Sequence, residues 1–288
     1  MLKVVILCGR ESRHLHVANR LCRAADVVAV VQAQRPWSWR RVRKALRPAH
    51  LAQKLRWRLT CAGRDPSEAR FFFGERAPAL DHPELRVRVP DINHPAVLAL
   101  VEREQPDVVA VFGTSMIRGP LVGRGRLGMI NLHCGLAPWY RGVDSAFWAL
   151  LAGRPEQVGG TLHFIEEGLD TGALLAHVHP EIAPEDDHRT LYWKTIRDCA
   201  EAFAELLACL ERGERFGCPQ GACPQGAEGH LYRARDRTPA LERALRAKLA
   251  AGFLAGRRLP PRITWFHAEH EPLRGEPRVP LPSTPGVR

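Results

Sequence analysis

Three polar side chains fall at the ends of two predicted strands. Asn131 and His133 lie two positions apart near the end of an apolar run at 128–133, so they share one face of that strand. Asp170 follows the next strand, in the glycine-flanked turn EEGLDTG. Because ligands bind at the carboxyl ends of strands in an open parallel sheet, we expect an amide, an imidazole and a carboxylate to converge there.

These side chains suit the attack of an amine on a carbonyl carbon. Such an attack builds negative charge on the oxygen and positive charge on the nitrogen. The Asn131 amide and the His133 imidazole can stabilise the oxyanion by donating to it. Asp170 would raise the pKa of a neighbouring imidazole, and it could hold a water that carries a proton. The alternative is that the three side chains only cap turns.

The pattern of strands and helices places these residues in an α/β sheet. Apolar runs alternate with segments of helical periodicity, which predicts a Rossmann-like, doubly wound, mostly parallel sheet. We assign the catalytic domain to residues 1–213, with a basic insertion at 34–64. A small, mainly helical C-terminal extension follows at 214–288, and its Pro-rich tail from about residue 271 is predicted to be disordered. The expected strands are 3–8, 26–32, 86–90, 107–112, 128–133, 160–166 and 173–178, and the expected helices are 13–24, 50–60, 94–104, 144–151, 190–212 and 238–254.

The composition is that of an ordinary globular protein, with 45% apolar and 25% charged residues. The N-terminal apolar run is too short for a signal peptide, and no run is long enough for a transmembrane helix. The eight cysteines are scattered rather than framed at regular spacing, so we expect reduced thiols and a cytoplasmic protein. A zinc site at the repeated CPQGA would lack further ligands, and no metal is expected.

The net charge of +11 has a local source. Between Asp26 and Asp65 the chain has no acidic residue, and three tryptophans are interleaved with the basic residues of 35–58. Three interpretations stay open: a solvated loop, a contact with an acidic membrane surface, and a contact with nucleotide or RNA phosphates. A peripheral position at the membrane and a homo-oligomer are both compatible with the sequence.

The stretches INLHCGLAPWYRG and TLHFIEEGLDTG resemble the formyltransferases that use 10-formyltetrahydrofolate. Asn131, His133 and Asp170 match the catalytic residues of that family one by one, and His163 matches a histidine that often precedes the Asp. The resemblance covers roughly residues 3–213. It implies transfer of a formyl group from 10-formyltetrahydrofolate, as co-substrate, to a primary amine, without a metal.

The resemblance also implies where the two substrates bind. The segment FGTSMIRGPL matches the family's pterin-facing loop, and the turn before Asp170 would close the other side. For Met116 and Ile117 the alternative is core packing. The residues assigned to folate binding are Thr114, Ser115, Met116, Ile117, Glu166, Glu167 and Gly168, and those assigned to the amine substrate are Tyr140 and Arg141.

The departures from the family pattern bear on the amine. The first turn, CGRESRHLH, lacks the Gly-Ser-rich phosphate loop of the glycinamide ribonucleotide enzymes. The segment after residue 213 is shorter and more helical than the C-terminal barrel of the methionyl-tRNA enzymes. The run DSAFWALLAGRPEQVGGTLHFI looks most like N-formyltransferases of nucleotide-linked amino sugars. A methionyl-tRNA-type formyltransferase, a formylfolate hydrolase and a non-catalytic RNA- or membrane-binding relative stay as alternatives.

Overall fold

The computed structural model describes residues 1–34, 66–166, 168, 170–220 and 229–268. Almost all of the basic insertion predicted at 34–64, with its expected helix at 50–60, lies outside the described residues. The tail predicted to be disordered from about residue 271 lies outside them as well. In the described part of the chain, no helix is both long and apolar enough to cross a membrane.

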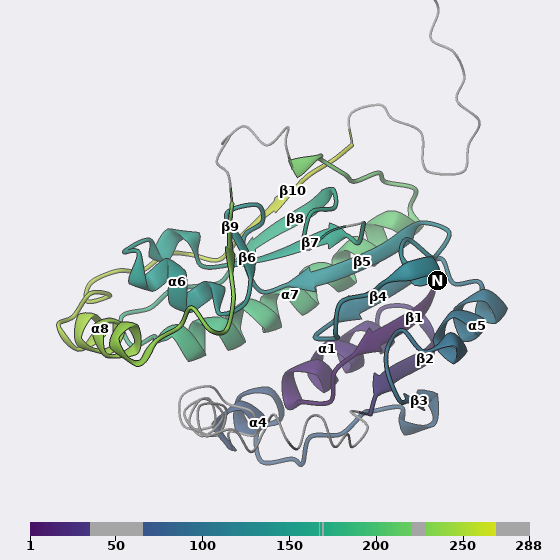
Figure 1. Ribbon diagram of the computed structural model, residues 1–288, viewed down its shortest axis with the longest axis horizontal. Coiled ribbons are helices and arrows are strands. Elements are labelled where there is room, and N and C mark those ends of the chain that lie inside the picture. The colour runs from purple at the N-terminus through teal and green to yellow at the C-terminus, as the bar shows by residue number, and fades with distance from the viewer. Residues whose placement is uncertain (35–65, 167, 169, 221–228, 269–288) are drawn as a thin grey trace, which may run out of the picture.

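The described residues form one eight-stranded sheet in the order β10-β8-β7-β5-β4-β1-β2-β3, and a small sheet of β6 with β9 (Figure 1). The five strands from β3 to β5 are parallel, and the three strands beyond β5 are antiparallel to their neighbours. The predicted Rossmann-like, mostly parallel sheet is confirmed. The strands are β1 (Lys3–Cys8), β2 (Asp26–Ala33), β3 (Arg86–Val89), β4 (Val108–Phe112), β5 (Gly128–His133), β6 (Tyr140–Gly142), β7 (Gly160–Phe164), β8 (Leu174–His179), β9 (His230–Tyr232) and β10 (Arg262–Trp265).

Helices cover both faces of the large sheet, and α7 is the longest of those described. Asp187 caps its first turn by accepting from the N–H groups of Arg189 and Thr190. Gly213, with a φ of 84°, follows its end in the left-handed conformation that glycine favours there. The helices are α1 (Ser12–Cys22), α4 (Pro66–Phe73), α5 (Pro95–Glu104), α6 (Ser145–Leu151), α7 (His188–Glu211) and α8 (Pro239–Ala250), with short 3-10 turns η1 (Pro83–Leu85), η2 (Gly119–Leu121) and η3 (Pro155–Gln157).

The two largest apolar clusters of the core lie on opposite faces of the sheet, because successive strand residues point to opposite sides. Val4 and Ile6 of β1 pack in the cluster that also contains side chains of α1 and α7. Val5 and Leu7 pack in the other cluster, with side chains of α5. Burial on both faces explains why β1 reads as a continuous apolar run.

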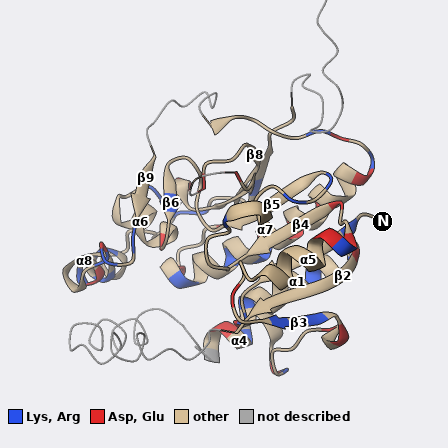
Figure 2. Cartoon of the chain, turned by 45° about the vertical axis from the view of Figure 1, so that its right-hand side comes forward, with Lys and Arg blue, Asp and Glu red and all other residues tan. Residues whose placement is uncertain are grey.

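The strand order reverses between β1 and β4. The chain passes from β1 through β2 to β3 at one edge, then returns to place β4 on the other side of β1. Open α/β sheets bind ligands at such a switch point, outside the carboxyl ends of the strands. The edge strand β3 has the sequence RVRV, with Arg86 and Arg88, and Figure 2 shows β3 with basic residues in blue. Repeated positive charge at an edge disfavours pairing with a further strand.

Two strands of the C-terminal segment join this architecture, and the sequence pattern predicted neither. β10 extends the large sheet antiparallel to β8, and β9 pairs in parallel with β6. Each is too short for a clear alternation of polar and apolar residues. The helix expected at 238–254 is observed as α8, which packs on α6.

Candidate active site

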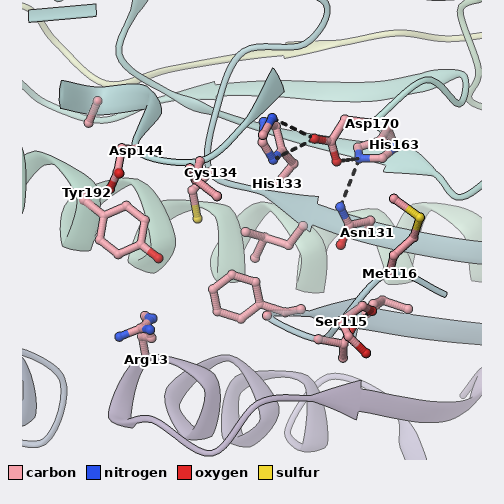
Figure 3. A pocket seen from close by; sticks show the side chains of 18 of the residues that line it. Arg13, Ser115, Met116, Asn131, His133, Cys134, Asp144, His163, Asp170 and Tyr192 are labelled. Carbon is pink, nitrogen blue, oxygen red and sulfur yellow. Dashed lines mark hydrogen bonds and ion pairs between the residues drawn. The ribbon is translucent and has the colours of Figure 1, made fainter. Parts of the chain in front are cut away.

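Asn131, His133 and Asp170 converge at the carboxyl end of β5 (Figure 3). Asn131 and His133 lie on the same face of β5, and the antiparallel register of β7 places His163 opposite Asn131. Asp170 comes from the turn after β7 and has a φ of 52°, a left-handed conformation that Asp adopts more readily than most residues. The convergence inferred from spacing alone is therefore present in the structure.

The Asn131 amide is oriented by His163. The Nδ1 atom of His163 lies 2.8 Å from the Phe164 carbonyl oxygen, which can only accept, so Nδ1 carries the proton. In the neutral ring Nε2 is then an acceptor, and the Asn131 Nδ2 donates to it at 3.0 Å. Among the described residues, no other acceptor bonds to that Nδ2, so its second hydrogen is available to a ligand.

The His133 ring is fixed by the loop that follows its own strand. Its Nε2 donates to the Tyr140 carbonyl oxygen at 2.8 Å, because a carbonyl oxygen only accepts. Its Nδ1 faces the Asp170 Oδ2 at 3.6 Å, which is longer than a hydrogen bond but within the range of an ion pair. In the neutral ring this Nδ1 carries a lone pair, so it is the position where His133 can take up a proton.

Asp170 is held as a carboxylate. Burial by itself would raise its pKa, but the His163 and His133 rings in their protonated forms and the Gly142 N–H together outweigh burial and lower the pKa to about 2. The Gly142 N–H donates to Oδ2 at 3.1 Å, and the His163 Nε2 lies 3.7 Å from Oδ1. Asp170 is therefore negatively charged at neutral pH although its side chain is only 9% exposed.

The pKa of His133 differs from the sequence-based expectation. We expected the neighbouring carboxylate to raise it. Burial is the larger effect and lowers the pKa below its usual value, while Asp170 and the Tyr140 carbonyl oppose that change. His133 is thus neutral in the resting site, and its only N–H already donates to Tyr140. It can donate to a ligand from Nδ1 only after it gains a proton there.

A cavity of about 510 Å³ adjoins the three catalytic candidates. Of the residues assigned to folate, Thr114, Ser115, Met116, Ile117, Glu166 and Gly168 line this cavity, whereas Glu167 lies outside the described residues. Met116 is 44% exposed, which argues against core packing at that position. Ile117 belongs to the core cluster on the α5 side as well as to the cavity wall.

The residues assigned to the amine substrate lie apart from the cavity wall. Tyr140 is buried, its hydroxyl donates to Gln157, and its ring stacks on Tyr232. Arg141 is not among the described residues that line the cavity. Their assignment to substrate binding stays a prediction, and what the structure shows for Tyr140 is its carbonyl contact with His133.

One part of the cavity wall was not foreseen from the sequence. It includes Arg13 of α1, Glu68 of α4, Tyr192 of α7 and the pair of Asp144 with Arg237. Figure 3 shows Arg13, Tyr192 and Asp144 away from Ser115 and Met116, with Cys134 and His133 between the two groups. These residues come from five separate parts of the chain, so no local spacing could have revealed them.

The C-terminal segment supports the loop that contacts His133 and Asp170. β6 supplies the Tyr140 carbonyl that contacts His133 and the Gly142 N–H that contacts Asp170, and β9 is its partner strand. Tyr232 of β9 stacks on Tyr140 with ring centroids 5.9 Å apart and on Trp148 at 4.6 Å. Pairing with β9 therefore holds the backbone groups that orient His133 and Asp170.

An amide, an imidazole and a carboxylate at the carboxyl end of β5, beside a cavity of about 510 Å³, suit a group-transfer enzyme of Rossmann-like fold. The chain belongs to the formyl transferase family, because the family model described as "Formyl transferase" matches residues 3–207. Members of this family are transferases of one-carbon groups.

Similarity to individual proteins supports this family assignment. The chain is 38% identical over 127 residues to a methionyl-tRNA formyltransferase of Synechococcus sp. (strain JA-3-3Ab), covering 44% of this chain and 39% of that protein. It is 30% identical over 132 residues to a methionyl-tRNA formyltransferase of Chlorobium chlorochromatii (strain CaD3), covering 46% and 42%. The chain thus matches about two fifths of the length of these curated relatives.

The fold is shared with solved structures over most of the chain. A 4-N formyltransferase from Francisella tularensis matches with a TM-score of 0.55 and 13% identity, covering 86% of this chain and 87% of that one. A sugar N-formyltransferase from Shewanella sp. FDAARGOS_354 matches with a TM-score of 0.52 and 17% identity, covering 85% and 87%. At these identities the comparison establishes the fold alone.

Proposed function

We propose that the protein is an N-formyltransferase that moves a formyl group from 10-formyltetrahydrofolate to the primary amine of a nucleotide-linked amino sugar. The observation that carries the proposal is the convergence of Asn131, His133 and Asp170 beside one cavity. The residues at 114–117 offer backbone groups and the exposed Met116 side chain to a flat ring, which fits a pterin. Bound there, the folate supplies the formyl carbon that the amine attacks.

Asn131 stabilises the oxygen of the formyl group as negative charge develops on it. One hydrogen of its Nδ2 is committed to His163. In this proposal the other hydrogen donates to the formyl oxygen. A donor fixed before the reaction is effective because it needs no reorganisation when the charge appears. His163 is therefore a positioning residue in this proposal.

His133 takes the proton that the attacking nitrogen must lose, and its Nδ1 is the position that receives it. Asp170 is too weak a base for this task at neutral pH, because its pKa is about 2. At 3.6 Å from Nδ1 it stabilises the imidazolium that forms. The protonated Nδ1 can then return the proton to the leaving nitrogen of the folate.

The choice of an amino sugar rests on the shared fold and on the sequence. The structural match to the Francisella 4-N formyltransferase and to the Shewanella sugar N-formyltransferase covers at least 85% of this chain, including part of the C-terminal segment. The match to the methionyl-tRNA enzymes covers less than half of the chain. Methionyl-tRNA is the second candidate because those relatives are the more similar in sequence, and the basic insertion that would meet RNA lies outside the described residues.

A mass-spectrometric screen tests the proposal. The protein is incubated with 10-formyltetrahydrofolate and a panel of nucleotide-linked amino sugars, with methionyl-tRNA as a separate arm. We expect one amino sugar to gain the mass of a single carbonyl group, and His133→Ala to abolish the gain. Formate released at the same rate with and without amines would identify a hydrolase, and formylation of methionyl-tRNA alone would replace the proposed acceptor.

A further inference from the structure

Asp144 has an unusual conformation at the start of α6. Its φ of 59° lies in the left-handed region, and its side chain makes no capping hydrogen bond although it occupies the N-cap position. Asp at this position ordinarily bonds to the N–H groups of the first turn. Strained backbone conformations of this kind occur most often at functional sites. The contacts of the Asp144 carboxylate therefore indicate what this conformation serves.

The Asp144 carboxylate contacts Arg237 instead. Its Oδ1 accepts from the Arg237 Nη1 at 3.1 Å. Arg237 is itself well anchored, with Nη2 at 3.1 Å from the His188 Nε2, Nε at 3.3 Å from a Glu242 oxygen and the guanidinium 4.3 Å above the Phe147 ring. Its side chain is only 6% exposed. Arg237 is therefore fixed, and it in turn fixes the carboxylate.

The second oxygen of Asp144 is available to a ligand. Within the part of the chain that the structure describes, no donor bonds to Oδ2, and the side chain is 25% exposed. Asp144 and Arg237 both line the cavity that holds the catalytic residues. Asp144 is two residues after Gly142, so the Cα atoms of these two residues are at most about 7 Å apart. The Gly142 N–H donates to Asp170, which places Asp144 close in the chain to the Asp170 contact.

The charge at this position favours a neutral donor over a cation. The guanidinium of Arg237 compensates the carboxylate of Asp144, and the neighbouring Arg13 and Glu68 form a second compensated pair at 2.8 Å. A paired carboxylate retains its capacity to accept a hydrogen bond but attracts an ammonium group less strongly. Arg237 also lies beyond residue 207, where the match to the family model ends.

We propose that Asp144 binds a hydroxyl group of the acceptor next to the carbon that bears the reacting nitrogen, with Arg237 as its positioning residue. This rests on the proposed function, since it assumes an amine with a neighbouring hydroxyl. The C-terminal segment then sets the preference for the acceptor, while the family domain supplies the chemistry. Folate binding is independent of this pair.

The test measures binding and turnover with dTDP-linked 4-amino-4,6-dideoxyglucose and with its analogue that lacks the neighbouring hydroxyl. Asp144→Asn keeps the size of the side chain, and Asp144→Gly keeps the left-handed backbone without strain. We expect both variants to weaken binding of the amino sugar by roughly tenfold to a hundredfold in calorimetry, with the KM for formylfolate unchanged. The analogue should bind the wild type and Asp144→Asn equally weakly.

Arg237→Lys keeps the charge but loses the planar fork that holds two partners. Alone, Arg237→Lys should raise the KM for the amino sugar. Combined with Asp144→Asn, it should raise that KM little further. If Asp144 serves only the left-handed backbone, Asp144→Gly should bind the amino sugar as the wild type does, and that result would overturn the inference. It is also overturned if the variants weaken binding of the amino sugar and of its analogue equally, or if the wild type does not bind the amino sugar. Tight binding of the amino sugar without formylation would instead refute the proposed function and leave this contact standing.

Discussion

Replacing Asp170 by Asn should destabilise the fold by an amount that depends on pH. The pKa of Asp170 falls from its usual 3.8 to about 2 in the folded protein. At ~1.4 kcal/mol for each pKa unit, the ionised carboxylate stabilises the fold by about 2 kcal/mol. Because the folded pKa is the lower one, this stability is present above pH 3.8 and is lost as the pH falls through about 2. At pH 3 about half of it should remain.

Urea unfolding of the wild type and Asp170→Asn at several pH values measures this difference directly. Sulfate can be added to keep both proteins folded in acid. The buried histidines His14 and His177 also destabilise the fold as the pH falls below 6.5, and they act equally on both proteins. His133 does not, because Asp170 raises its pKa, so the two proteins are compared in acid, where Asp170 itself titrates. We expect a difference of about 2 kcal/mol at pH 5 that shrinks to about 1 kcal/mol at pH 3. A difference that stays constant between pH 5 and pH 3, or none at pH 5, would refute the assigned environment of Asp170.

Three further substitutions have distinct expected outcomes. Asn131→Ala should lower kcat by roughly a hundredfold through loss of an oxyanion donor, and a near-normal rate in steady-state kinetics would remove Asn131 from the mechanism. Thr161→Val should lower the free energy of unfolding by about 2–4 kcal/mol, because its buried hydroxyl bridges two backbone groups of the loop after β5; calorimetry showing no change would contradict this. Gly142→Ala should lower kcat, because its added Cβ would collide with the β9 backbone and displace the N–H that bonds to Asp170. Gly74→Ala, at a positive φ in open space, is the matched control and should cost only about 1 kcal/mol of stability with kcat unchanged.

The sequence predicted the parts of the fold that local patterns determine. The buried strands β1, β2, β4 and β5 read as apolar runs because both faces of the sheet are covered. Asn131 and His133 share a face because side chains alternate along a strand. The turn that carries Asp170 was recognisable from its flanking glycines. For these elements, the residues that determine the local structure lie within a few positions of it in the sequence.

The remainder of the site depends on contacts between distant segments. The strands β6 and β9 have only three residues each, and their pairing joins positions about ninety residues apart. The pKa of His133 follows from how deeply the ring is buried, which spacing does not report. The pair of Asp144 and Arg237 likewise requires the C-terminal segment to return to the cavity.

The fate of an isotopically labelled formyl carbon tests the central claim most directly. The protein is given labelled 10-formyltetrahydrofolate with the amino sugar that the screen identifies, and the label is followed by NMR. We expect it to appear in the formamide of the sugar, with little in free formate, and to stay on the folate in the His133→Ala protein. Label that accumulates in formate while the amine is unchanged would contradict the assignment of Asn131, His133 and Asp170 to formyl transfer.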